Sequence, residues 1–285
     1  WTTWWRTSPK PSRASAPSSR ISPATSGSGR RAARRIEVKG QVEDFGVSPG
    51  GERLLATARG DLFTVPVEHG VTRNLTQRGD AHDREAAWSP DGERITFISD
   101  RSGEEQVYVI DEKGGEARAL TDFGALRLYR PVWSPASDAI AVHDHMGRIY
   151  VVDLDGDVNE VFAGEYGAIT DYQWAPDSKW MAFTVQTDAG TGAIRLWSRD
   201  SGRLIEATDG AFNANSPAFS ADGKHLYFLS DRGAAPQICA REWNYALDRE
   251  TGIYALALRP DVPHPFPPES DEAELKTASP EQKEP

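Results

Sequence analysis

Short runs of alternating apolar and polar residues, rich in β-branched and aromatic side chains, recur along the middle of the chain and predict β-strands. One unit shows the pattern clearly. Trp88 leads into Ser-Pro-Asp-Gly at 89–92, a tight-turn sequence, and strands are predicted at 94–98, 106–111 and 117–121. Four short strands of this kind would form one antiparallel sheet that cannot bury both of its faces alone.

The same plan occurs five times, each time beginning with an apolar residue that runs into Ser-Pro or a close variant. The five anchors are Val47-Ser48-Pro49, Trp88-Ser89-Pro90, Trp133-Ser134-Pro135, Trp174-Ala175-Pro176 and Phe219-Ser220-Ala221. Their spacings are 41, 45, 41 and 45 residues. A period in the low forties with several strands per repeat is typical of a β-propeller blade. The predicted fold is therefore all-β, a β-propeller with about five four-stranded blades, and the anchor aromatics are expected to fill the wedges between neighbouring sheets.

Further strands are predicted at 53–57, 61–65, 72–76, 139–142, 148–153, 180–184, 193–197 and 225–229. The fifth unit looks incomplete, because after residues 252–259 no outermost strand precedes a Pro-rich stretch. Residues 36–38 could close that sheet and complete a small ring. A seven-bladed ring of this period needs roughly 300 residues, so the preferred interpretation is part of a seven-bladed ring.

Composition changes abruptly at both ends of the repeats. Residues 1–35 hold eight of the 32 Lys and Arg residues and no acid, and they are expected to be disordered or an artefact of gene prediction. Residues 36–259 are expected to hold the propeller blades, and the Pro- and Glu-rich residues 260–285 to form a linker or tail.

The rest of the chain is strongly acidic, with the remaining 24 basic residues against 43 acidic ones, a net charge of −19. Such a body repels the phosphate backbone, so no nucleic-acid partner is expected. No apolar stretch approaches the ~18 residues of a membrane span, so no membrane partner is expected either. A single cysteine, Cys239, excludes an internal disulfide and a multi-cysteine zinc site.

Candidate chemistry is sparse. The chain has no Gly-x-Ser-x-Gly elbow, phosphate-binding loop or dinucleotide fingerprint, and the repeated Ser-Pro serines suit turns better than catalysis. Cys239 and His225 form a weak candidate pair for nucleophilic catalysis. His143 and His145 would share one face of a strand, as two metal ligands do, but a clear third ligand is missing.

Asp153-Leu154-Asp155-Gly156-Asp157 resembles the start of a calcium loop. Val158 and Gly164 stand where an EF-hand needs Gly and Glu, so a hairpin turn is the better interpretation. We therefore expect no catalytic residues, no cofactor-binding residues and no metal site in this chain.

Several motifs resemble known propeller repeats. The segment from Trp88 to Gly92 with Ile98-Ser99-Asp100-Arg101 looks like the TolB-like, WD40-type repeat. The following segments are similar to the propeller region of tricorn-type proteases: 60–66, 72–76, 227–232, 242–246, 253–259 and 265–272. The likeness covers about residues 36–275.

The resemblance implies the substrate-filtering and guiding propeller of a cytoplasmic serine peptidase that degrades peptides. Its partners would be peptides or proteins at the channel and loops and the rest of the parent, which is expected to be a homo-oligomer. Catalytic Ser, His and Glu of such peptidases lie in a later half, and no residue here matches them. Whether the chain is itself an enzyme thus stays open. The alternatives are a free-standing TolB-like interaction module of the periplasm and the propeller of a prolyl-oligopeptidase-type enzyme.

Overall fold

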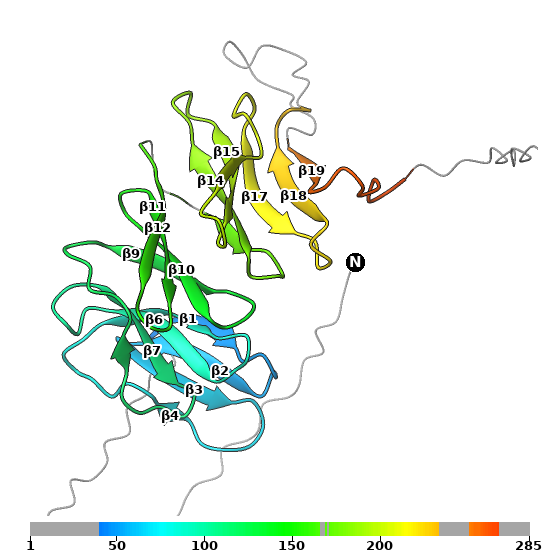
Figure 1. The fold of residues 1–285 in the computed structure, drawn as a ribbon. Helices are drawn as coiled ribbons and strands as arrows, with labels where there is room; N and C mark the ends of the chain where they lie inside the picture. The colour runs from blue at the N-terminus through cyan, green and yellow to red at the C-terminus, as the bar shows by residue number, and fades with distance from the viewer. Residues whose placement is uncertain (1–39, 166–168, 170, 234–250, 268–285) are drawn as a thin grey trace, which may run out of the picture. The chain divides into compact units, whose positions relative to one another are not determined.

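The computed structural model describes residues 40–165, 169, 171–233 and 251–267, and their regular structure is entirely β-strand (Figure 1). Nineteen strands form five antiparallel sheets, four of them four-stranded and the last three-stranded in the part described. The predicted all-β fold is confirmed. The fifth unit, for which the sequence predicted no outermost strand after residues 252–259, has three strands in these ranges, and the proposed closing segment 36–38 lies outside them.

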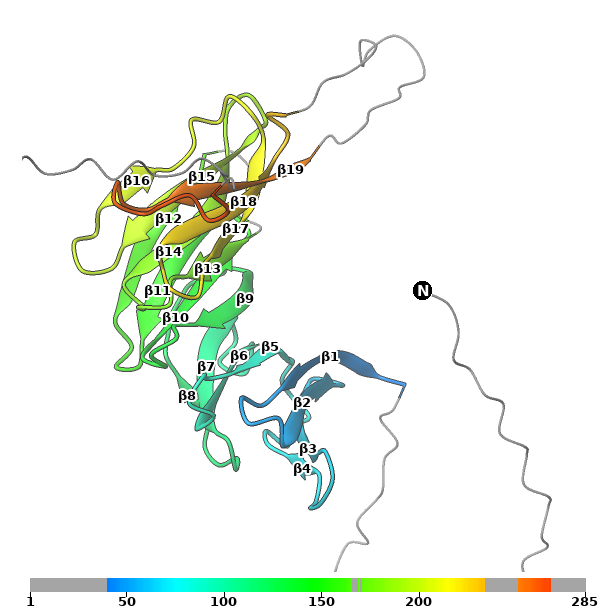
Figure 2. The ribbon, with the colours of Figure 1, turned by 90° about the vertical axis from the view of Figure 1, so that its right-hand side faces the viewer.

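Each sheet uses consecutive strands in simple up-and-down order (Figures 1 and 2). The first sheet holds β1 (Val42–Val47), β2 (Arg53–Ala58), β3 (Asp61–Pro66) and β4 (Arg73–Asn74), and the second β5 (Asp83–Trp88), β6 (Arg94–Ser99), β7 (Gln106–Asp111) and β8 (Arg118–Ala119). The third holds β9 (Leu128–Trp133), β10 (Ala139–Asp144), β11 (Arg148–Asp153) and β12 (Val158–Ala163). The fourth holds β13 (Tyr172–Trp174), β14 (Trp180–Gln186), β15 (Gly192–Ser198) and β16 (Leu204–Glu206), and the fifth β17 (Ala214–Phe219), β18 (His225–Ser230) and β19 (Gly252–Ala257).

The recurring Ser-Pro sequence forms the turn between the first and second strands of a sheet. In the second sheet the Ser89 hydroxyl accepts a hydrogen bond from the Arg94 amide (2.9 Å) and donates one to the Arg94 carbonyl (3.0 Å). The turn then needs a residue with positive φ, and Gly92 (φ 76°) and Ser137 (φ 60°) supply it in the second and third sheets. The repeat in the sequence therefore reflects a requirement of the turn.

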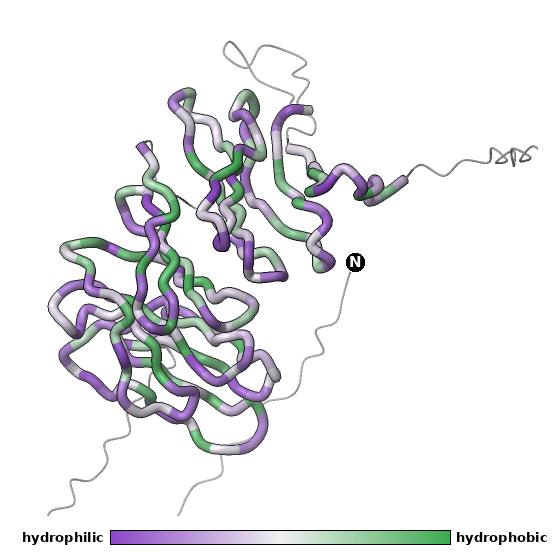
Figure 3. The backbone as a smooth tube through the Cα atoms, viewed as in Figure 1, coloured by the Kyte–Doolittle hydropathy of each residue, from purple (hydrophilic) through white to green (hydrophobic). Residues whose placement is uncertain are grey.

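The hydrophobic core lies between successive sheets, and hydrophobic residues recur along the buried strands (Figure 3). Trp133 and Trp174 are almost fully buried in it. Their indole Nε1 atoms donate hydrogen bonds to the carbonyls of Ala87 (3.1 Å) and Val132 (3.2 Å) of the preceding sheet. The prediction that anchor aromatics fill the wedges is confirmed at these two junctions.

Among the described residues, no helix is long and apolar enough to cross a lipid bilayer. Residues 1–35, residue Cys239 and most of the expected tail lie outside the described part of the chain.

Candidate functional site on the first strands

First strands of neighbouring sheets contact one another at three of the four junctions. β1 contacts β5, β5 contacts β9 and β13 contacts β17. In a propeller the first strands of the blades surround the central channel. The polar side chains of these strands therefore form the candidate functional site.

A β-bulge reshapes three of these strands at one position. Glu85, Arg130 and Ser216 have φ angles of 50°, 49° and 54°, and each stands three residues before the anchor aromatic of its sheet. The pairing register shifts at this place in β5 and β17. Bulges re-aim a side chain and are common beside functional sites. Asp171 holds the equivalent position before Trp174.

Carboxylates at this position connect one sheet to the next. The Arg130 amide donates a hydrogen bond to Glu85, and the Ser216 amide donates one to Asp171. The strained backbone is thus held by a charge-assisted bond from the neighbouring sheet. We call Glu85, Arg130, Asp171 and Ser216 the first-strand row.

A buried arginine next to the first-strand row contacts residues of two sheets. Arg84 is 8 % exposed, forms ion pairs with Glu85 and Glu105 (2.6 Å to the latter) and donates to the Leu128 carbonyl at 2.7 Å. Since a buried guanidinium needs several acceptors, these contacts fix its position between the second and third sheets.

Three ring-bearing side chains, those of Tyr129, His143 and Tyr172, pack together next to Arg130. The His143 ring stacks on Tyr129 with centroids 5.3 Å apart and meets Tyr172 edge-on at 5.7 Å. Burial lowers the pKa of His143 to about 4, so the imidazole is neutral at pH 7. Burial also raises the pKa of the Tyr172 phenol, which donates to the Arg130 carbonyl. Neither ring carries charge at neutral pH.

The proposed pairing of His143 with His145 is wrong. β10 ends at Asp144, so His143 is buried while His145 lies exposed in the following turn, where its Nδ1 accepts from the Arg127 amide (3.3 Å). The strand cannot continue because Asp144 Oδ1 accepts the amides of the turn itself. Within the described ranges, no group of three His, Cys, Asp or Glu residues could hold a metal ion.

The calcium-like segment is the hairpin turn that the sequence predicted, between β11 and β12. Asp153 Oδ1 accepts the amides of Asp155, Gly156 and Asp157 at 2.9–3.0 Å. His225 lies 3.1 Å from the Pro263 carbonyl through its Nε2, and its suggested partner Cys239 is outside the described residues.

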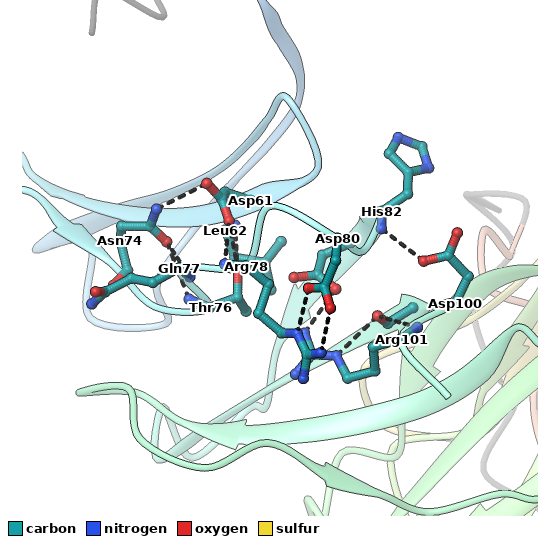
Figure 4. Close-up of polar contacts among 12 residues, drawn as sticks. Asp61, Leu62, Asn74, Thr76, Gln77, Arg78, Asp80, His82, Asp100 and Arg101 are labelled. Atoms are coloured by element: carbon teal, nitrogen blue, oxygen red, sulfur yellow. Dashed lines mark hydrogen bonds and ion pairs between the residues drawn. The ribbon is translucent and has the colours of Figure 1, made fainter. Parts of the chain in front are cut away.

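The Leu-Thr motif that ends a blade has a structural role (Figure 4). The Thr76 hydroxyl accepts the Leu62 amide at 3.1 Å, and Asp61 accepts bonds from the Asn74 side chain (3.0 Å) and the Arg78 amide (3.1 Å). These bonds close the first sheet on its outer side. The second sheet has an equivalent arrangement. There the Thr121 hydroxyl accepts a hydrogen bond from the Val107 amide at 3.0 Å and donates one to the Gln106 side chain at 2.7 Å.

The Ser-Asp-Arg motif is also structural. Arg101 forms an ion pair with the fully buried Asp83 at 2.7 Å, and its guanidinium lies 4.9 Å from the Phe97 ring and 4.8 Å from the Tyr108 ring (Figure 4 shows the arginine). Arg232 repeats the arrangement over two rings of the fifth sheet. The Leu-Thr and Ser-Asp-Arg motifs therefore make contacts that stabilise the fold.

Sequence reasoning missed the first-strand row. The sequence did contain a signal for this row, because the third residue before each anchor is polar in every repeat. These residues are Asp44, Glu85, Arg130, Asp171 and Ser216.

Successive four-stranded antiparallel sheets joined by first-strand contacts and aromatic wedges define a β-propeller. Residues 42–285 match the family model of the tricorn protease second β-propeller domain. The chain belongs to that family.

Individual relatives support the same family. The chain is 28 % identical over 218 residues to tricorn protease homolog 1 of Streptomyces coelicolor, covering 74 % of this chain and 20 % of that protein. It is 34 % identical over 169 residues to the uncharacterized peptidase YuxL of Bacillus subtilis, covering 59 % and 23 %. The chain thus spans about a fifth to a quarter of these relatives. The crystal structure of the tricorn protease matches with a TM-score of 0.71 and 20 % identity, over 84 % of this chain and 24 % of that one.

Proposed function

We propose that this chain is the substrate-filtering and substrate-guiding propeller of a tricorn-type cytoplasmic serine peptidase that degrades peptides, with the catalytic half outside the chain. The observation that carries the proposal is the family match over residues 42–285. On this proposal the chain holds no catalytic, cofactor or metal residues of its own. Its partners are peptides and the rest of the parent peptidase, which assembles as a homo-oligomer.

The first strands supply a surface suited to guiding peptides. Arg130, Gln173 and Ser216 are exposed there, and Arg130 and Ser216 lie at bulges braced by the neighbouring sheet. A rigid, polar and charged lining can select peptides by size and charge without holding them tightly. Each hydrogen bond between peptide and lining replaces a hydrogen bond to water, so it adds little to the net free energy of binding.

The first experiment separates guidance from catalysis. The purified chain is incubated with a set of fluorogenic peptides, with and without a serine-directed covalent inhibitor. We expect no turnover above buffer. Robust hydrolysis that the inhibitor blocks would show that the chain is itself a peptidase and would overturn the proposal.

A second candidate function is that of a free-standing TolB-like interaction module of the periplasm, because residues 88–92 and 98–101 are similar to the TolB-type repeat. The structure of putative TolB from Agrobacterium tumefaciens matches with a TM-score of 0.52 and 21 % identity over 76 % of this chain and 77 % of that one. At this identity the match supports the fold alone. Sequencing the gene on both sides of the segment separates the two functions, since a secretory signal upstream favours the module and a peptidase half downstream favours the propeller of an enzyme.

A further inference from the structure

A cavity of about 680 Å³ opens between the fourth and fifth sheets. Its inner wall is apolar, formed by Trp180, Leu196, Ile205, Phe219 and Leu258. Cavities of this size, apolar inside with a few polar groups at the mouth, are typical ligand sites. None of its lining residues belongs to the first-strand row, so this cavity is separate from the surface proposed to guide peptides.

The first reason for the cavity is a smaller wedge. At the two preceding junctions Trp133 and Trp174 are buried and donate their indole N–H to a carbonyl of the sheet before them. The fifth sheet has Phe219 at this position, and its ring is smaller and has no N–H group. Phe219 is only partly buried and lines the cavity.

The second reason is a missing hydrogen bond between turns. The Ser137 hydroxyl accepts the Asp91 amide (3.0 Å), and the Ser178 hydroxyl accepts the Ala136 amide (2.9 Å), so each turn is tied to the next one. The fifth sheet has Gly223 at the serine position and offers no hydroxyl to the turn that contains Asp177. Asp177 and Gly223 both line the mouth of the cavity. Neither of the two hydrogen bonds seen at the second-to-third and third-to-fourth junctions can form at the junction where the cavity opens.

We propose that this cavity binds an aromatic side chain of a partner peptide, preferably tryptophan flanked by basic residues. The indole is the group that fills the equivalent wedge at the earlier junctions, so the space between two such sheets suits its flat shape. The proposal stands independently of the peptidase function.

The preference for basic neighbours follows from the charges at the mouth. Asp177 and Asp222 lie there, and a hydrogen bond from the Ser220 hydroxyl lowers the pKa of Asp222 to about 2, so this carboxylate is charged at neutral pH. Lys224 forms an ion pair with Asp222 (3.3 Å) and Arg259 lies 3.5 Å from Asp261, so these two pairs largely cancel and the Asp177 carboxylate leaves the mouth negatively charged. The chain as a whole carries a formal net charge of −11. Cationic peptides are therefore attracted and anionic ones repelled.

Fluorine NMR of the chain labelled with 5-fluorotryptophan tests the site. The Trp180 signal is assigned by its loss in W180F, and the labelled wild-type chain is titrated with the peptide acetyl-Lys-Trp-Lys-amide. We expect a saturable shift of the Trp180 signal. Acetyl-Glu-Trp-Glu-amide should bind at least about threefold more weakly because of the carboxylates, and acetyl-Lys-Ala-Lys-amide should give no shift.

Two variants close the cavity in different ways. F219W/G223S installs the wedge and the serine of the earlier junctions, and I205W fills the space from another wall. Both should weaken binding of the Lys-Trp-Lys peptide at least tenfold, while F45A, which removes an exposed phenylalanine of the first sheet, should leave it unchanged. If far-UV circular dichroism shows that F219W/G223S does not fold, peptide binding by I205W tests the proposal instead. Unchanged binding in a folded, filled variant, an equal shift with the alanine peptide, or no shift with the tryptophan peptide would each overturn the proposal.

Discussion

Replacing Trp174 by phenylalanine tests how strongly the aromatic wedges hold neighbouring sheets together. The Trp174 side chain is 4 % exposed, its Nε1 donates to the Val132 carbonyl at 3.2 Å, and its ring meets Trp197 edge-on with centroids 6.4 Å apart. Phenylalanine keeps an aromatic ring at the site but removes the donor and part of the volume.

The magnitude follows from these two losses. The hydrogen bond contributes about 1 kcal/mol to the unfolding free energy, and the void left by the smaller ring costs about 1–2 kcal/mol more. We therefore expect W174F to lower the free energy of unfolding by about 2–3 kcal/mol. Urea unfolding followed by far-UV circular dichroism should show this as a lower midpoint.

The matched control is W180F, the same substitution at a partly buried tryptophan that lines the open cavity. Because that ring is less enclosed, its replacement should cost less than about 1 kcal/mol. A loss below about 0.5 kcal/mol for W174F, or equal losses for the two variants, would refute the assignment of the wedge as a stabilising contact.

Two further predictions concern buried charge and pH. R101M removes the cation that faces the fully buried Asp83 and should lower the unfolding free energy by about 3–5 kcal/mol, whereas R78M, which breaks the exposed pair with Asp80, should leave the urea midpoint nearly unchanged in the same assay. For His143, the folded-state pKa of about 4 lies below the ordinary value of about 6.5, so its contribution to stability is complete above pH 6.5 and is lost as pH falls towards 4. Urea midpoints between pH 7 and pH 4 should fall less steeply for H143F than for wild type, and identical slopes would contradict the reasoning.

The repeat was predictable because its turns obey local rules. A serine that caps the turn, a proline and then a residue able to take positive φ recur at fixed spacing, and the buried tryptophans follow from the same period. The strands and the wedge role of Trp133 and Trp174 could therefore be predicted without coordinates.

The bulges and the buried arginine could not be predicted in the same way. The positive φ of Glu85 and Arg130 depends on a bond between two sheets 45 residues apart in sequence, and Arg84 finds its acceptors Glu105 and Leu128 in the same non-local manner. The prediction that His143 and His145 share one strand face failed for a local reason. Asp144 accepts the amide of the following turn and ends the strand, which an alternating pattern does not reveal.

The cavity between the fourth and fifth sheets could not be predicted from single positions of the repeat either. Phe219 in place of tryptophan and Gly223 in place of serine are each ordinary variations on the repeat. The first junction also has a glycine, Gly92, at the serine position, but it keeps a tryptophan, Trp88. The fourth-to-fifth junction combines a phenylalanine with a glycine, and the structure shows that both line the cavity.

The claim that the first strands guide peptides is tested most directly in the full-length protein that contains this segment. The measurement is the ratio of kcat/KM for a long acidic peptide to that for a short neutral one, compared between wild type, R130E and the control R203E, an exposed arginine between β15 and β16. A guiding role predicts that R130E lowers this ratio roughly threefold to tenfold, because the reversed charge repels the long substrate on its way in, while R203E leaves it unchanged. An unchanged ratio in R130E, or an equal fall in R203E, would contradict the account.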